Sequence, residues 1–299
     1  MLTVGQGWEE GKTSVPWNGT DPCSVARTRT RVTGVGASAE RPGIEVLNRA
    51  VDILDAFTVA PTPSLRLSEL AERTGLPKAT LHRLLAALEV LGLVERTGSG
   101  HQLGIRLFEL GEHVPRKERL REAAQPFMQD LFEVSHDTVH LAVLEGTDVV
   151  YLERIRGHRS APISSRVGGR LPAYCTGVGK AMLAFAPEAA MSVLAGPLER
   201  RTAYTIIDHQ LFAEELNGIR QSGLSFDHEE NQIGVNCVAA PILLSGRPIA
   251  AVSITSTSSR VEVERFASAV KAAALGIQRV VAKSPGIVLE PRTRRARKK

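Results

Sequence analysis

Leu67 to Arg96 reads LSELAERTGLPKATLHRLLAALEVLGLVER, and this stretch is the most informative part of the chain. It describes two short amphipathic helices joined by a tight turn and followed by an extended segment. We expect Ser68 to cap the first helix, Gly75 to end it in a left-handed conformation, and Pro77 to open the second. This spacing predicts a helix-turn-helix, which places one helix in the major groove of DNA.

The second predicted helix has two unlike faces. Leucines at helical spacing must face a core, and they are Leu81, Leu84, Leu85, Leu88 and Leu91. The opposite face is short-chained and basic, with no carboxylate before Glu89. Positive groups meet phosphates, and small residues let the backbone approach base edges. The candidate DNA-binding residues of this helix are therefore Lys78, Ala79, Thr80, His82 and Arg83.

Two strand-like runs follow the helix pair and flank a Gly-rich turn at 97–100. They predict a β-hairpin that acts as a wing, with candidate DNA contacts at Arg96, Ser99 and His101. A preceding amphipathic helix is expected to close a three-helix core with Val46, Leu47, Ala50, Val51, Ile53, Leu54 and Phe57. Helix pairs of this kind also occur as plain core in all-α proteins. The preceding helix, the basic face and the hairpin together favour DNA binding.

Length and composition allow two ordinary domains with well-buried cores. The chain has 299 residues, 43% of them hydrophobic, a formal net charge of +5 and a pI of about 9.3. This mildly basic balance permits nucleic-acid binding without proving it, because much of the excess lies in the tails. Cys23, Cys175 and Cys237 form neither a metal pattern nor a disulfide framework. Because neither a signal peptide nor a membrane-spanning run is recognisable, we expect a cytoplasmic protein without membrane contact.

Composition and periodicity divide the chain into five segments. Pro115 is expected to bend or break the helix that links the two folded parts. The expected segments are a disordered arm (1–43), a winged helix-turn-helix (44–105), a linker helix (106–121), a second domain (122–284) and a basic tail (285–299).

The second domain alternates between strand-like and helical runs. The expected strands are 138–144, 149–155, 161–167, 224–227, 235–244 and 249–255. The expected helices are 123–134, 177–185, 187–194, 211–222 and 262–283. Antiparallel strands with interrupting and flanking helices predict an α+β domain in which helices back a sheet.

Three segments, in this order, resemble the IclR family of bacterial transcription regulators. They are 76–85 (LPKATLHRLL), 171–184 (LPAYCTGVGKAMLA), and 233–242 (IGVNCVAAPI) followed by 249–255 (IAAVSIT). The resemblance covers roughly residues 43–283 and implies a winged helix-turn-helix followed by a GAF-like effector-binding domain. It also implies a homodimer or dimer of dimers on a palindromic operator in double-stranded DNA. The implied effector is a small organic acid or aromatic metabolite, and a repressor is favoured over an activator.

The second domain is expected to hold the small-molecule site. A helix start offers free N–H groups and a dipole that favours a carboxylate, and the residues concerned are Thr176, Gly177, Val178 and Gly179. Ile163 and Leu171 are expected to form an apolar wall. By the resemblance, polar contacts come from residues that match the family's pocket, namely Asp227, Cys237, Ser253 and Thr255. Glycines of a tight turn and small strand residues give the same pattern without a ligand.

Three other chemistries are less well supported. Lys180 follows glycines but lacks the spacing of a phosphate loop. His228-Glu229-Glu230 lacks a second histidine at metal-site spacing. Cys175 has only distant candidate bases, His140 and His158, and no assignable orienting group. We therefore predict no catalytic residue, no cofactor and no metal. The alternatives are an enzyme that depends on Cys175 or Glu229 and a protein-interaction module whose basic helix meets an acidic partner.

Overall fold

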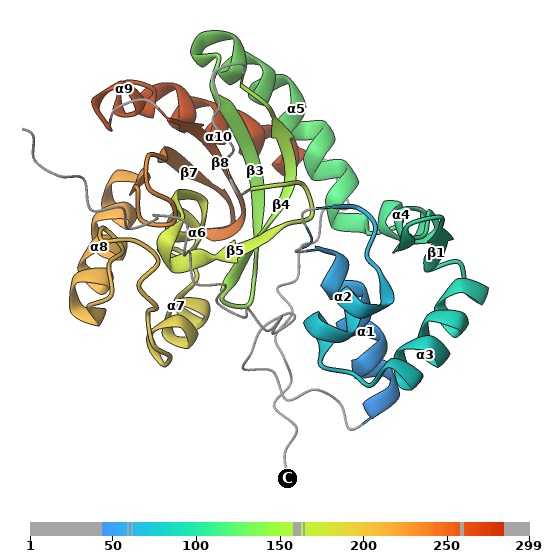
Figure 1. Cartoon of the computed structure of the whole chain (residues 1–299). Helices are drawn as coiled ribbons and strands as arrows, with labels where there is room; N and C mark the ends of the chain where they lie inside the picture. The colour runs from blue at the N-terminus through green and yellow to red at the C-terminus, as the bar shows by residue number, and fades with distance from the viewer. Residues whose placement is uncertain are drawn as a thin grey trace, which may run out of the picture. The chain divides into compact units, whose positions relative to one another are not determined.

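The computed structural model describes residues 44–58, 60, 62–157, 163, 165–257 and 260–283. The expected disordered arm (1–43) and basic tail (285–299) lie outside these residues. The described chain contains a helix-turn-helix unit and, later in the sequence, an antiparallel sheet with helices on both faces (Figure 1). The α+β class with an N-terminal helix-turn-helix is confirmed.

The N-terminal unit is a three-helix core with a β-hairpin, as its periodicity predicts. Its elements are α1 (Glu45–Thr58), α2 (Leu67–Thr74), α3 (Lys78–Val90), β1 (Val94–Thr97) and β2 (Gly100–Leu103). Apolar side chains from every helix and from β1 are buried together, among them Ile53, Leu70, Leu81, Leu85 and Val94. Leu65 forms a β-bridge with His101, which ties the segment before α2 to the hairpin.

Some local expectations for this unit are wrong. Ser68 does not cap α2, because the cap position is Arg66, whose backbone N–H donates to Glu69 Oε2 at 2.7 Å. Pro77 is the residue before α3 and not its first residue. Gly75 does end α2 in the left-handed conformation, with φ 70°. The core is narrower than expected, since four of its candidate members are exposed: Val46, Leu47, Val51 and Leu91.

Pro115 breaks the linker segment, as predicted. Helix α4 (Arg106–Glu112) ends before it, and α5 (Pro115–Ser135) begins with it, where its missing N–H leaves no hydrogen bond unmade. The expected separate helices over 106–121 and 123–134 are wrong, because α5 runs through both segments and contains Pro126. Neither α5 nor any other helix in the described residues is long and apolar enough to cross a membrane.

Within the described residues, six antiparallel strands form the sheet of the C-terminal unit, in the order β5-β4-β3-β8-β7-β6. The strands are β3 (Thr138–Glu145), β4 (Asp148–Ile155), β5 (Arg170–Pro172), β6 (Ser225–His228), β7 (Asn236–Leu244) and β8 (Arg247–Ser256). The expected strand over 161–167 is wrong for the residues described there. A glycine turn at Gly168 (φ 75°) and Gly169 redirects the chain, so that the edge strand forms after the turn and pairs with 148–150.

Helices cover both faces of this sheet (Figure 1). On one face α5 packs with α10 (Ala267–Lys283); on the other, α6 (Gly177–Leu183) lies against β7 and β8. The remaining helical elements are η1 (Ala173–Cys175), α7 (Pro187–Leu194), α8 (His209–Ser222) and α9 (Arg260–Glu264). The expected closing helix 262–283 is divided between α9 and α10 by a turn at 265–266.

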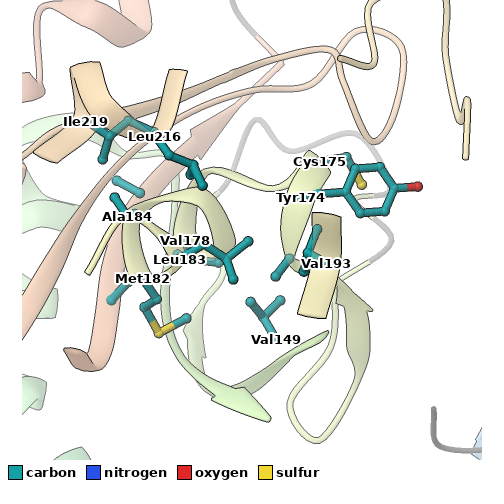
Figure 2. Close-up of a cluster of buried hydrophobic side chains, with 14 of the residues drawn as sticks. Val149, Tyr174, Cys175, Val178, Met182, Leu183, Ala184, Val193, Leu216 and Ile219 are labelled. Atoms are coloured by element: carbon teal, nitrogen blue, oxygen red, sulfur yellow. The ribbon is translucent and has the colours of Figure 1, made fainter. Parts of the chain in front are cut away.

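Strand alternation sorts side chains between the two faces. Val139 and Leu141 of β3 belong to the apolar cluster beneath α5 and α10, whereas Ala142 belongs to the cluster around α6. Figure 2 shows the latter cluster, in which side chains of α6 meet those of α7 and α8. Its labelled members from these helices and from β4 are Val149, Val178, Met182, Leu183, Val193, Leu216 and Ile219.

Gly104→Ala is predicted to destabilise the winged-helix unit. A Cβ on Gly104 would lie 2.1 Å from the Gly92 carbonyl oxygen, where the backbone must move. We expect the free energy of unfolding, measured by urea denaturation of the full chain, to fall by about 1–3 kcal/mol. Gly98→Ala on the same hairpin is the matched control, because a Cβ there meets nothing within 4 Å. Equal stabilities of the two variants would contradict this close approach.

Candidate functional site

The outer face of α3 carries the predicted DNA-reading residues in the predicted arrangement. Leu81, Leu84, Leu85 and Leu88 are buried, and these fix the helix against the core. The side chains opposite them are exposed at Lys78, Ala79, His82 and Arg83, and half-buried at Thr80. The exposed face is therefore basic near its N-terminal end and short elsewhere, which suits approach to a nucleic-acid groove.

The wing residues differ in the exposure of their side chains. Arg96 and Ser99 are exposed, and the Ser99 hydroxyl lies 3.2 Å from those of Ser64 and Thr97. His101 is turned toward α3, where its Nε2 lies 3.2 Å from Glu89 Oε1. Its side chain is only 15% exposed, so His101 does not present a free side chain to DNA as we expected.

A small cavity lies between the sheet and the N-terminal turn of α6. Nine of the ten candidate effector-binding residues line it. They are Ile163, Leu171, Thr176, Gly177, Val178, Asp227, Cys237, Ser253 and Thr255. The geometry therefore brings together residues that are far apart in the sequence, and their role in binding stays a prediction.

Strand register explains why the polar members of this set converge. Asp227 of β6 is opposite Cys237 of β7, which is opposite Thr255 of β8. Two residues along β8, Ser253 is opposite His140 of β3. Residues two apart on a strand share a face, so these two rows present their side chains to the same cavity.

Gly179 is the candidate that does not line the cavity. A Cβ on it would lie 2.2 Å from the Ala173 carbonyl oxygen, so its role is the close approach of α6 to η1. Thr176 precedes α6, but its hydroxyl donates backward to the carbonyls of Pro172 (3.2 Å) and Ala173 (3.4 Å). The Thr176 side chain therefore does not cap α6, and Gly177 and Val178 are at the cavity wall.

Sequence reasoning missed six residues of the lining, namely His140, Tyr151, Ser165, Asn231, Gln232 and Val235. His140 is the most informative of these. Its Nε2 lies 2.7 Å from Ser165 Oγ, and its Nδ1 lies 3.2 Å from Thr255 Oγ1. Burial, reinforced by Arg154, lowers the pKa of His140 to about 3, so the ring is neutral. The sequence did hold one signal for His140. It lies two residues before Ala142 in the predicted strand, so the two side chains are on the same face of the sheet.

Two polar groups of the cavity wall, Ser253 and Asp227, are buried. Ser253 is 1% exposed, and its Oγ lies near the Cys237 thiol without a hydrogen-bond partner among the described residues. Asp227 is 5% exposed, and burial, followed by the nearby Glu230 carboxylate, raises its pKa to about 7. A buried polar group without a partner is costly, so a ligand that hydrogen-bonds Ser253 gains binding energy here.

Two cysteines, Cys175 and Cys237, are buried in the C-terminal unit. Burial raises the pKa of both cysteine thiols, Cys175 and Cys237, to about 12, so neither is a ready thiolate nucleophile. Within the described ranges, no three His, Cys, Asp or Glu side chains are grouped so as to hold a metal ion. The raised pKa of Cys175 weakens the alternative of an enzyme that uses this cysteine as its nucleophile.

Lys180 of α6 is buried, with 1% of its side chain exposed. Its Nζ lies 2.5 Å from Glu230 Oε1 and 2.9 Å from Glu215 Oε1. These carboxylates outweigh the effect of burial and raise the pKa of Lys180. The residue is thus a buried cation held by ion pairs, which agrees with the rejection of a phosphate loop.

Comparison with known families identifies the chain. Residues 46–98 match the IclR helix-turn-helix domain, and residues 113–279 match the C-terminal domain described as bacterial transcriptional regulator IclR. The chain belongs to the IclR family of bacterial transcriptional regulators. The resemblance drawn from the three sequence segments is therefore confirmed.

Individual IclR-family relatives align with most of the chain. The regulator XynR of Escherichia coli is 33% identical over 248 residues, covering 80% of this chain and 98% of its own. The repressor IclR of E. coli is 32% identical, covering 81% and 90%. Among solved structures, an IclR homologue from Microbacterium hydrocarbonoxydans in complex with 4-hydroxybenzoate is 31% identical with a TM-score of 0.72, covering 80% and 100%. The relatives are transcriptional regulators, which fits a protein that is not an enzyme.

Gly177→Ala is predicted to overpack the contact between α6 and the sheet. The new Cβ would lie 2.9 Å from Cys237 Sγ, and overpacking of this kind lowers the free energy of unfolding by about 1–3 kcal/mol. Cys237→Ala removes the sulfur and leaves neighbours at 3.5 Å, so the same glycine substitution is expected to cost less in that background. Urea denaturation of the two single variants and the double variant measures this coupling, and a cost independent of residue 237 would contradict it.

Proposed function

We propose that this IclR-family protein is an effector-responsive repressor that binds a palindromic operator through α3 and the wing. The observation that carries the proposal is the exposed basic face of α3, set opposite a fully buried leucine face in a helix-turn-helix. Lys78 and Arg83 supply positive charge there, and Ala79 lets the backbone come close to DNA. Arg96 is the exposed basic residue of the wing.

A second copy of the chain is part of this proposal. One winged helix reads too few base pairs for useful specificity, whereas a two-fold dimer reads two half-sites about one helical turn apart. A homodimer or a dimer of dimers on a palindromic operator meets this requirement. The names of two relatives support repression, since the E. coli proteins IclR and AllR are both described as transcriptional repressors.

The proposed effector is a small organic acid or aromatic metabolite that binds in the cavity beneath α6. The apolar wall includes Ile163, Leu171 and Val178, and the polar wall includes Asp227 and Ser253. A cavity with one apolar and one polar side suits a compact molecule with a polar head. The 4-hydroxybenzoate complex of the Microbacterium homologue supports this class of effector.

The effector must act by binding unequally to two arrangements of the protein. A ligand with equal affinity for the DNA-bound and free arrangements would leave operator binding unchanged. We infer that effector binding releases the operator. A protein-interaction module with an acidic partner at α3 is the second candidate, and it predicts that effector and DNA have no influence on each other.

Arg83→Ala tests the role of the α3 face. We expect operator binding to weaken by about 1–3 kcal/mol and base preference to change at one position of each half-site, if Arg83 contacts a base edge. Lys78→Ala is expected to weaken binding uniformly and to lower the salt dependence, as for a phosphate contact. Fluorescence anisotropy with a set of singly substituted operators measures both effects.

The control for both variants is Arg279→Ala. Arg279 is exposed on α10, so its substitution removes the same charge outside the helix-turn-helix. Equal weakening by Arg83→Ala and Arg279→Ala would show that net charge alone governs affinity. It would also contradict DNA recognition by α3.

Ser253→Ala tests the role of the cavity. The substitution removes a buried hydroxyl that has no hydrogen-bond partner in the described chain, so we expect unchanged or slightly higher stability. We also expect effector affinity to fall about ten-fold, because a hydrogen bond to the ligand is lost. The measurements are urea denaturation and calorimetric titration with small carboxylic acids, including 4-hydroxybenzoate. Unchanged affinity for every acid that binds the wild type would exclude Ser253 from the site.

A further inference from the structure

A buried ion cluster lies behind the cavity wall and is not explained by effector contact alone. Lys180 of α6 joins Glu230, which follows β6, and Glu215 of α8. The side chains of Lys180 and Glu230 are 1% and 5% exposed. Burying a charged pair costs more in desolvation than most pairs return, so such a cluster is weak evidence for a stabilising role. Its position next to the cavity suggests a second purpose.

Glu230 connects the ion cluster to the cavity. Its side chain pairs with Lys180, while its backbone N–H donates to Asp227 Oδ1 at 2.8 Å. The Asp227 carboxyl lines the cavity. The hydroxyl of Thr205 donates to the Glu230 carbonyl at 2.7 Å, and that of Thr202 donates to the Glu229 carbonyl at 2.7 Å. One residue therefore fixes both the ion pair and the orientation of a carboxyl in the effector site.

The charges of this region do not balance. Three carboxyls, those of Asp227, Glu230 and Glu215, surround one ammonium group. Glu230 Oε2 is buried without a hydrogen-bond partner among the described residues. Among the described residues that line the cavity, none is lysine or arginine. An anionic effector that enters therefore approaches the Asp227 carboxyl with no lysine or arginine among the described lining residues, and a proton on Asp227 removes the repulsion between the two carboxylates.

We propose that Lys180 and Glu230 are positioning residues of the effector site, which hold Asp227 in the cavity wall and set the charge with which Asp227 meets the effector. The consequence is that an anionic effector binds together with one proton, which Asp227 donates as a hydrogen bond to the effector carboxylate. This inference rests on the proposed function for the identity of the ligand. The effect of Lys180 and Glu230 on the ionisation of Asp227 can be tested without a ligand.

The electrostatics of Asp227 agree with this geometry. Burial raises its pKa to about 7, the Glu230 carboxylate adds to the rise, and the Lys180 ammonium opposes it. Other titratable groups around the cavity are neutral in this range, because burial lowers the pKa of His140 to about 3 and raises the pKa values of the Cys175 and Cys237 thiols and of the Tyr151 phenol. Glu230 and Lys180 are therefore the charged groups that set the ionisation of Asp227.

The first test uses the full chain without a ligand. A carboxyl whose pKa is higher in the folded than in the unfolded state stabilises the fold at low pH. That contribution is lost as the pH rises through the folded-state value. We expect urea denaturation between pH 4 and pH 9 to show this loss, levelling off above about pH 7, in the wild type and not in Asp227→Asn.

The pH at which this loss levels off reports the titration midpoint of Asp227 in the folded protein. Variants of the ion pair are expected to move this midpoint in opposite directions. Glu230→Gln removes a like charge and leaves Lys180 paired with Glu215, so the midpoint is expected to fall by about one pH unit. Lys180→Met removes the opposing cation, so the midpoint is expected to rise. Lys180→Arg keeps the charge and is expected to keep the midpoint. Each variant is compared with its own Asp227→Asn derivative, which isolates the titration of Asp227.

A merely structural ion pair would change stability without moving this midpoint. The same midpoint in Glu230→Gln and in the wild type would therefore overturn the proposal. If Lys180→Met does not fold, the double variant Lys180→Met/Glu230→Gln removes the unpaired buried charge. Its midpoint is expected to return toward that of the wild type.

The second test uses 4-hydroxybenzoate as the probe anion. We expect its affinity to fall about ten-fold for each pH unit above the midpoint, and calorimetry in buffers of different ionisation enthalpy to show uptake of close to one proton. Asp227→Asn should bind without this pH dependence. Binding by the wild type without proton uptake would overturn the proton-linked step. Absence of binding, with the ligand-free midpoint shifts intact, would overturn the assigned effector class and leave the positioning role standing.

Discussion

Complete burial of α6 is the constraint on which the C-terminal unit depends. All seven residues of this helix are buried, and one of them is a lysine. A buried ammonium group must be paired, and the two carboxylates that pair with it come from α8 and from the segment after β6. Gly179 allows α6 to approach η1, and Gly177 allows it to approach β7. The same contacts that bury the helix therefore place its first turn at the cavity.

The two faces of the sheet carry different kinds of side chain. Beneath α5 and α10 the strands contribute apolar side chains, among them Val139, Leu141, Val252 and Ile254. On the α6 face the same strands contribute His140, Ser253 and Thr255, which are buried but line a cavity. One face thus supplies the apolar burial that stabilises the unit. The other face can carry buried polar groups, which cost stability but recognise a ligand.

Helical periodicity predicted the helix-turn-helix well, because the spacing of Leu81, Leu84, Leu85 and Leu88 places all four on one face of a helix. It failed where tertiary contacts decide: no spacing in the sequence shows that Glu89 turns His101 inward. In the C-terminal unit most of the cavity was found, partly because the family resemblance marked Asp227, Cys237, Ser253 and Thr255. His140 was missed because its role depends on pairing with Ser253, a register that one strand alone does not contain.

Glycines and capping residues show the same limit. Gly177 and Gly179 lie two residues apart and looked alike in the sequence, yet one lines the cavity and the other accommodates the η1 backbone. Ser68 is a good cap by residue type, but α2 begins one residue before it. Composition and spacing identify the elements and the family. Which side of an element meets a ligand is decided by packing against segments far along the chain.

The most direct test is a gel-shift titration of the full chain on the DNA upstream of its own gene, with a scrambled duplex of equal length and with salt varied. A repressor that reads DNA through α3 gives a shift specific to the upstream duplex, which weakens steeply as salt rises. Addition of the effector should release it. Equal binding to both duplexes, or none at low salt, would contradict sequence-specific recognition by α3.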